Sequence, residues 1–238
     1  MTEDGRKLWK EVFGDSDAWI SAFVEKREPE GFFEYGQSGL LSMVFRYPIT
    51  LFIEDERFSA MMIAGGATRE DARGRGLYSR LLRKAAGGCD AILYPSDMAR
   101  RLYSSMGFLT SGLSEAWLDG EGMDESLSYD IGKLDSIYMK AFREKGGIAR
   151  DEYSWNEILD NRRLYLGKDS YAIGSDDAII EAAGTDENGL RELLSRLRGR
   201  ILFSDRTLLG RILTPEGSIP SGMASSARLA GFYLPETY

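Results

Sequence analysis

The spacing of apolar residues along the first half of the chain predicts two helices followed by a set of strands. Apolar side chains recur at helical spacing over residues 3–13 and again over 16–26. Between these segments, Gly14 and the polar residues that follow it end the first helix and cap the second. Short apolar runs separated by polar turns then predict strands, at 31–35, 40–45, 51–53 and 58–64.

Helical and strand patterns alternate through the rest of the chain. In the first half, a polar loop at 69–75 precedes a helix at 76–86, a strand at 90–94, a helix at 97–106 and a closing strand or pair of strands at 108–118. The Gly-rich polar segment 119–124 is the best candidate for a linker, so we predict one domain over residues 1–122 and a second over 123–238. The second half carries helical patterns at 131–143, 151–162, 187–198 and 205–213, and strand patterns at 170–174, 177–183 and 201–203.

The second half also echoes the first in sequence. Three short segments of the first half have counterparts in the second: residues 67–68 correspond to 184–185, 76–81 to 189–194, and 91–97 to 200–205. Between the first two anchors the second copy is four residues shorter, and the missing residues fall in the loop 69–75. Chance matching is the alternative to duplication, but a repeated order of elements favours duplication. We therefore predict an α/β (α+β) fold with two tandem units, each a mixed, mostly antiparallel sheet flanked by helices, and we expect function in the first unit.

Composition excludes several classes of chemistry. The 238 residues include no histidine, which excludes histidine-based catalysis and histidine-ligated metals, and Cys89 is the one cysteine, which excludes disulfides and thiolate zinc sites. With 30 basic and 38 acidic side chains the net charge is −8, which argues against sequence-independent nucleic-acid binding and suits cationic ligands. No stretch approaches the ~20 apolar residues of a membrane span, and the N-terminus lacks a secretory core. We expect a cytoplasmic protein without metal.

The segment most informative about chemistry runs from Gly65 to Ser79. A strand enters it, a Gly-rich basic turn follows, and a helix leaves it. The free N–H groups of a helix's first turn bind anions, and Gly74 and Gly76 allow the backbone to approach one closely. Arg73 and Arg75 add positive charge, so a pyrophosphate is the natural ligand. The alternative is a strand–helix turn with solvated arginines, and the segment is neither a Rossmann GxGxxG turn nor a nucleotide P-loop.

This segment resembles the pyrophosphate-binding signature of the GNAT superfamily of N-acetyltransferases, (Gln/Arg)-x-x-Gly-x-(Gly/Ala). Arg73, Gly76 and Tyr78 occupy its three fixed positions, and Tyr78 departs from the small residue expected at the third. The resemblance implies that acetyl-CoA is the co-substrate and that residues 66–68 bind its pantetheine arm. The positions that it assigns to the cofactor are Gly66, Ala67, Thr68, Arg73, Gly74, Arg75, Gly76, Leu77, Tyr78 and Ser96.

A second segment, Leu102 to Phe108, resembles the aromatic–Tyr–x–x–x–Gly–aromatic ending of the fourth helix in the same superfamily. The resemblance implies that Tyr103 lies near the sulfur of the cofactor and protonates the departing thiolate. The chemistry is sound, because a thiolate leaves more readily when a donor of comparable pKa is nearby. A structural tyrosine on an amphipathic helix is the alternative.

Within the superfamily, the chain is most similar to the enhanced intracellular survival (Eis) branch. The likeness lies in Phe13-Gly-Asp-Ser16, Arg46-Tyr-Pro-Ile-Thr50, Gly66-Ala-Thr68 and Leu93-Tyr-Pro95. That branch pairs an acetyltransferase unit with a degenerate second unit and adds a sterol-carrier-like third, for which 238 residues leave no room. The resemblance therefore implies an acetyl-CoA-binding domain followed by a degenerate GNAT-like domain.

These observations lead to one expected activity, transfer of an acetyl group from acetyl-CoA to a primary amine by direct attack. The acceptor would be a small-molecule or peptide amine, and a homo-oligomer is possible. Candidates for the general base are water, Glu34 and the C-terminal carboxylate of Tyr238. Two other functions stay open: a non-catalytic, regulatory acyl-CoA-binding protein, and a tandem-unit transferase of the aminoacyl-tRNA-using kind.

Overall fold

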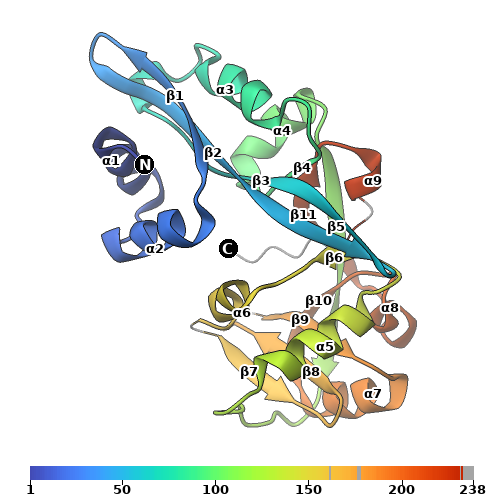
Figure 1. Cartoon of the computed structure of the whole chain (residues 1–238). Coiled ribbons are helices and arrows are strands. Elements are labelled where there is room, and N and C mark those ends of the chain that lie inside the picture. The colour runs from blue at the N-terminus through green and yellow to red at the C-terminus, as the bar shows by residue number, and fades with distance from the viewer. Residues whose placement is uncertain (161, 176–177, 231, 233–238) are drawn as a thin grey trace. The chain divides into compact units, whose positions relative to one another are not determined.

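The computed structural model describes residues 1–160, 162–175, 178–230 and 232, and within them one order of elements occurs twice (Figure 1). Each copy has the same order, which is two helices, three strands, a helix, a strand, a helix and a strand, with short additions. The contacts divide the chain into two units. Unit 1 comprises Met1–Ile49, Ser59–Leu109 and Met223–Leu229, and unit 2 comprises Thr50–Phe58, Thr110–Gly222 and Ala230–Tyr238. The domain boundary after residue 122 stays a prediction.

The helices of unit 1 begin and end where local sequence signals place them. Thr2 and Ser16 cap the first two helices by accepting hydrogen bonds from the N–H groups of Gly5 and Trp19, and Gly14 ends the first in a left-handed conformation. The elements in this part of the chain are α1 (Glu3–Phe13), α2 (Asp17–Arg27), β1 (Glu30–Gly36), β2 (Gly39–Ile53), β3 (Glu56–Thr68), η1 (Glu70–Ala72), α3 (Leu77–Ala86), β4 (Ala91–Leu93) and α4 (Asp97–Ser105).

The sheet of unit 1 has the order β1-β2-β3-β4-β11. β1 and β2 are antiparallel, and β3 and β4 are parallel, with Met61 to Ile63 opposite Ala91 to Leu93. At its end, β11 (Gly217–Ala224) contributes Met223 and Ala224, which pair antiparallel with β4. β4 ends at Leu93, opposite Ile63, whereas β3 continues to Thr68. The last residues of β3 therefore extend beyond the strand beside them.

Unit 2 repeats this arrangement. Its elements are most of β5 (Leu109–Asp119), α5 (Ile131–Ala141), β6 (Gly147–Ile148), α6 (Glu152–Leu159), β7 (Arg163–Leu166), β8 (Ser170–Gly174), β9 (Ala178–Gly184), α7 (Glu187–Arg196), β10 (Arg198–Phe203), α8 (Leu208–Ile212) and the first part of β11, and α9 (Ala227–Ala230) follows β11. The strand order is β11-β5-β10-β9-β8-β7. β9 and β10 are parallel and joined through α7, as β3 and β4 are through α3. The predicted fold of mixed, largely antiparallel sheets flanked by helices is confirmed.

The structure differs from the predicted elements at several places. The predicted strands 40–45 and 51–53 are one strand, β2, which runs through Pro48. Its pairing with β1 ends at Arg46, so the missing N–H of Pro48 interrupts no bond to β1. The strands β6, β7 and β11 were not predicted. Helix α8 begins at Leu208 and not at residue 205.

Candidate active site

The loop between β3 and α3 has a backbone that only glycine adopts readily at two points. Gly74 and Gly76 have φ values of +76° and +69°, in the left-handed region. Gly76 is the N-cap of α3, and because it has no side chain, no side-chain oxygen caps the first turn of that helix. No side chain therefore competes with an external anion for the N–H groups there.

The corresponding helix of unit 2 is capped in the opposite way. The side chain of Asp186 accepts a hydrogen bond from the N–H of Gly189 at 2.9 Å, so a carboxylate of the chain itself caps the N-terminus of α7. β9 ends at Gly184 and α7 begins at Glu187, which leaves no room for a loop like the one before α3. Of these two related helices, α3 alone keeps an N-terminus suited to an external anion.

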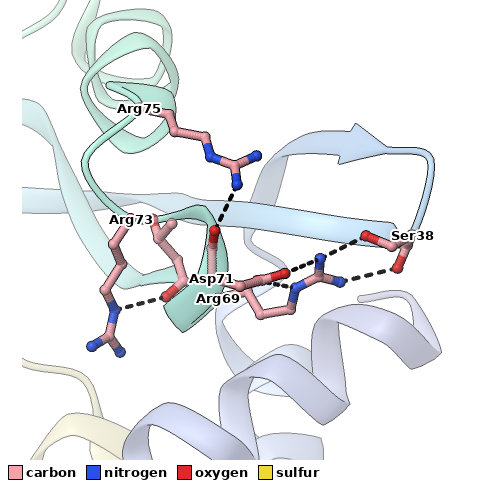
Figure 2. A network of polar contacts seen from close by, with 6 residues as sticks. Ser38, Arg69, Asp71, Arg73 and Arg75 are labelled. Atoms are coloured by element: carbon pink, nitrogen blue, oxygen red, sulfur yellow. Dashed lines mark hydrogen bonds and ion pairs between the residues drawn. The ribbon is translucent and has the colours of Figure 1, made fainter.

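A network of polar contacts holds the loop before α3 in place (Figure 2). Arg69 donates two hydrogen bonds to the carboxylate of Asp71, at 2.6 and 2.9 Å, and two to the carbonyl and hydroxyl oxygens of Ser38, at 3.0 and 2.6 Å. The hydrogen bond from Arg69 lowers the pKa of Asp71. Ser38 lies in the turn between β1 and β2, so Arg69 ties the loop to that hairpin. This network was not predicted from the sequence, because it depends on a hairpin that is distant along the chain.

Arg73 and Arg75 make weaker contacts than Arg69. Arg73 Nε donates to the carbonyl oxygen of Thr68 at 3.3 Å, and Arg75 donates to the carbonyl oxygen of Asp71 at 2.7 Å (Figure 2). In the described part of the chain, neither guanidinium forms an ion pair with a carboxylate, although the charge of Arg75 helps to lower the pKa of Asp71. Both side chains are exposed, so two positive charges stand beside the N-terminus of α3. This arrangement fits a doubly charged anion.

The end of β3 is anchored on the side of β2. The buried hydroxyl of Ser42 donates to the carbonyl oxygen of Ala67 at 3.0 Å and lies 2.8 Å from the hydroxyl of Thr68. The N–H of Arg69 donates to the carbonyl oxygen of Leu41 at 2.9 Å. These bonds fix the strand segment that the sequence assigned to pantetheine, beyond the point where β4 stops.

The two sequence motifs meet at a pair of tyrosines. The hydroxyl oxygens of Tyr78, in the first turn of α3, and Tyr103, in α4, lie 2.8 Å apart. Their rings are nearly perpendicular, with centroids 6.1 Å apart. Burial raises the pKa of both phenols, and the hydrogen bond with Tyr78 acts in the opposite direction on Tyr103. Tyr103 is 8% exposed. Because the pKa values of both phenols are raised, both stay protonated at neutral pH.

Gly66 explains how α3 accommodates a tyrosine where the signature has a small residue. A Cβ atom on Gly66 would lie 2.3 Å from the hydroxyl oxygen of Tyr78 and 2.6 Å from its Cζ atom. The ring of Tyr78 therefore lies directly against the backbone of β3. A bulky residue at one position is matched by a glycine at the other.

The remaining candidates differ in their surroundings. Ser96 is exposed at the N-cap of α4, and its side chain makes no capping bond. Glu34 accepts a hydrogen bond from Arg80 at 2.9 Å, which makes it an ion-pair partner. Cys89 is half-buried, with its thiol 3.6 Å from the carbonyl oxygen of Ala86. Tyr238, whose carboxylate was a candidate base, lies outside the described residues.

Among the described residues, no three histidine, cysteine, aspartate or glutamate side chains gather as a metal site would require. No helix there combines the length and the apolar character needed to span a bilayer.

Comparison with known proteins identifies the class of domain that the first half of the chain forms. Residues 2–110 match the family model of the acetyltransferase (GNAT) domain. This part of the chain is a GNAT acetyltransferase domain, which supports an N-acetyltransferase. The resemblance and the enzyme class predicted from the sequence are thereby confirmed. No curated protein matches the chain.

Solved structures show that the similarity in fold extends to the second half. A probable N-acyltransferase from Enterococcus faecalis has a TM-score of 0.71 at 16% identity, covering 93% of this chain and 69% of its own. A GCN5-related N-acetyltransferase from Kribbella flavida has a TM-score of 0.67 at 16% identity, covering 93% of this chain and 67% of its own. Eis1 from Mycobacterium abscessus has a TM-score of 0.66 at 14% identity, covering 97% of this chain and 73% of its own. At such identities the likeness concerns the fold.

Proposed function

We propose that the protein transfers the acetyl group of acetyl-CoA to a primary amine, with the cofactor bound in unit 1. The observation that carries this proposal is the uncapped N-terminus of α3, with Arg73 and Arg75 beside it. A pyrophosphate would accept hydrogen bonds from backbone N–H groups between residues 73 and 78 and neutralise both guanidinium charges. Backbone groups of Gly74, Gly76 and Leu77 supply this cradle.

The pantetheine arm is proposed to lie along the end of β3. Because β4 stops opposite Ile63, the edge of β3 beyond that point is suited to hydrogen bonds with the amides of the arm. Gly66, Ala67 and Thr68 are the proposed partners, and the bonds that Ser42 makes hold this segment rigid. Ser96, at the N-terminus of α4, is a further proposed contact with the cofactor.

The proposed reaction needs no metal and no covalent enzyme intermediate. The neutral amine attacks the thioester carbonyl, a C–N bond forms, and the C–S bond breaks as the tetrahedral intermediate collapses. Tyr103 gives its phenolic proton to the departing sulfur, and the attacking amine loses a proton to water. Glu34 is held by Arg80, which favours water as the base. Alignment of the two reactants supplies much of the acceleration.

The second half is proposed to be a degenerate GNAT-like unit without a cofactor. Asp186 places negative charge at the helix N-terminus where a pyrophosphate would have to bind. The acceptor is proposed to be a cationic small molecule or peptide amine, in keeping with the net charge of −8.

A binding and turnover experiment tests this function. Mass spectrometry of the purified protein should find retained CoA, and a thiol-release assay with acetyl-CoA over a panel of amines should find an acceptor. The double variant R73A/G76D should lose retained CoA with an unchanged circular dichroism spectrum, because it removes a cation and adds a carboxylate beside the α3 N-terminus. R191A, an exposed arginine of α7, is the matched control and should retain CoA.

The alternatives give different results in the same experiment. CoA retention without thiol release for any amine, and no effect of Y103F, would support a regulatory binding protein. Binding of aminoacyl-tRNA would support the aminoacyl-type transferase. Undiminished CoA retention by R73A/G76D would reject the proposed binding site.

A further inference from the structure

We infer that Tyr78 is a positioning residue for Tyr103: its hydroxyl donates a hydrogen bond to the Tyr103 oxygen and leaves the Tyr103 proton directed toward the departing thiolate. This inference rests on the proposed function. It concerns the signature position at which the chain departs from a small residue, and it gives that departure a chemical role.

The contact between the two hydroxyls is held from several sides. The Tyr78 ring lies against Gly66, where a Cβ would come within 2.3 Å of its hydroxyl oxygen. The Tyr103 ring packs edge-on against Phe108, with centroids 6.0 Å apart. Tyr103 belongs to the buried apolar cluster that includes Ile63 and Leu81, and the partly buried Tyr78 packs against that cluster. The 2.8 Å separation is therefore set by packing in the core.

The direction of this hydrogen bond decides which proton can be transferred. One hydrogen joins the two oxygens, so the phenol that accepts it keeps its own proton for another partner. The two oxygens lie 2.8 Å apart, and the distance allows either hydroxyl to donate. Tyr103 keeps its own proton for the sulfur only when Tyr78 is the donor, so the inferred bond runs in that direction.

The bond becomes stronger as the reaction proceeds. When the C–S bond breaks, the sulfur takes the proton of Tyr103, and the phenol oxygen of Tyr103 becomes negative. The hydroxyl of Tyr78 then donates to a charged oxygen, and such bonds are stronger than bonds between neutral groups. The proton that the amine gives to water restores the Tyr103 phenol, so the net reaction is acetyl-CoA plus amine to amide plus CoA thiol.

Replacing Tyr78 by phenylalanine tests the inference, because the ring that packs on Gly66 stays and only the hydroxyl is lost. We expect kcat to fall about 10- to 100-fold, the range for a hydrogen bond to a charged group, with KM for acetyl-CoA changed less than about twofold. The alkaline limb of the kcat profile should move to higher pH, because Tyr103 loses the bond that lowers its pKa. Y129F, which alters an exposed tyrosine, should change none of these values.

A titration that needs no turnover provides an independent readout. With 3,5-difluorotyrosine at position 103, whose phenol ionises near neutral pH, ultraviolet absorbance reports the pKa of that side chain directly. Adding Y78F should raise this pKa, because a donor to the phenolate is lost.

The outcomes separate this inference from the proposed function. A large loss with Y103F, unchanged kcat and pH profile with Y78F, and an unmoved titration would overturn the inference alone. Tyr78 would then be a packing residue. Absence of CoA binding and thiol release in the unmodified protein would overturn the proposed function and the inference with it.

Discussion

A single methyl group added at Gly66 should separate the two tyrosines. In G66A the new Cβ would lie 2.3 Å from the hydroxyl oxygen of Tyr78, 2.6 Å from Cζ and 2.7 Å from Cε2. Ordinary contacts between such atoms are about 3.5 Å or longer, so the end of the ring must move by roughly 1 Å. Overpacking of this kind costs about 1–3 kcal/mol, and the lost hydrogen bond adds about 0.5–1.5 kcal/mol. The free energy of unfolding should fall by about 2–4 kcal/mol.

A double-mutant cycle tests whether this cost comes from the Tyr78 ring. Y78A alone removes a largely buried ring and should also destabilise the protein by about 2–4 kcal/mol. In G66A/Y78A the methyl group has room, so the two losses should not add, and a coupling energy of about 1–3 kcal/mol should appear. Urea unfolding followed by circular dichroism measures all four corners of the cycle.

The control for G66A is alanine at another strand glycine with more space. A Cβ on Gly112, in β5, would find its nearest atom, the carbonyl oxygen of Ile219, at 3.8 Å. G112A should therefore change the free energy of unfolding by less than about 1 kcal/mol. Additive effects of G66A and Y78A, or equal losses for G66A and G112A, would refute the packing argument.

Three further predictions concern polar groups. E181Q should cost about 3–5 kcal/mol of unfolding free energy, because it leaves the buried Arg150 without the carboxylate that it binds at 2.6 and 2.7 Å. D55N, which breaks an equally short but exposed ion pair, should cost less than about 1 kcal/mol in the same urea experiment. Burial lowers the pKa of Lys145 to about 8, so above that pH the unfolded chain binds more protons than the folded one. The free energy of unfolding should therefore rise between pH 8 and 10. K145M should flatten this rise when urea unfolding is measured across that range. S42A should raise KM for acetyl-CoA several-fold in the thiol-release assay with little change in kcat, because it loosens the end of β3 without touching the reacting atoms.

The elements that the sequence predicted well are those defined by signals within a few residues. Helix α1 begins and ends where Thr2 and Gly14 cap it, and α3 begins where Gly76 interrupts the polar loop. Strand β11 was missed because its place depends on β4, more than a hundred residues earlier, with which Met223 pairs opposite Leu93. Apolar periodicity has no information about such a partner.

The candidate site divides in the same way. The glycines and arginines of the loop before α3 form a local motif, so their proposed role as an anion cradle could be read from the sequence. The hydrogen bonds that hold this loop could not be predicted, because Arg69 reaches Ser38 in a hairpin about thirty residues earlier. Positions of charged side chains in a loop depend on such distant partners, which a pattern along the chain does not specify.

The pairing of Tyr78 with Gly66 shows why a departure from a family signature needs structural interpretation. In the sequence, a tyrosine in a position for small residues and a glycine inside a strand are two separate irregularities, twelve residues apart. In the fold they are one contact, since the missing Cβ leaves room for the ring whose hydroxyl meets Tyr103. The tyrosine therefore places a hydroxyl 2.8 Å from that of Tyr103, the group proposed to protonate the thiolate. Asp186 in the second unit is the contrasting case, because there the chain's own carboxylate caps the helix N-terminus.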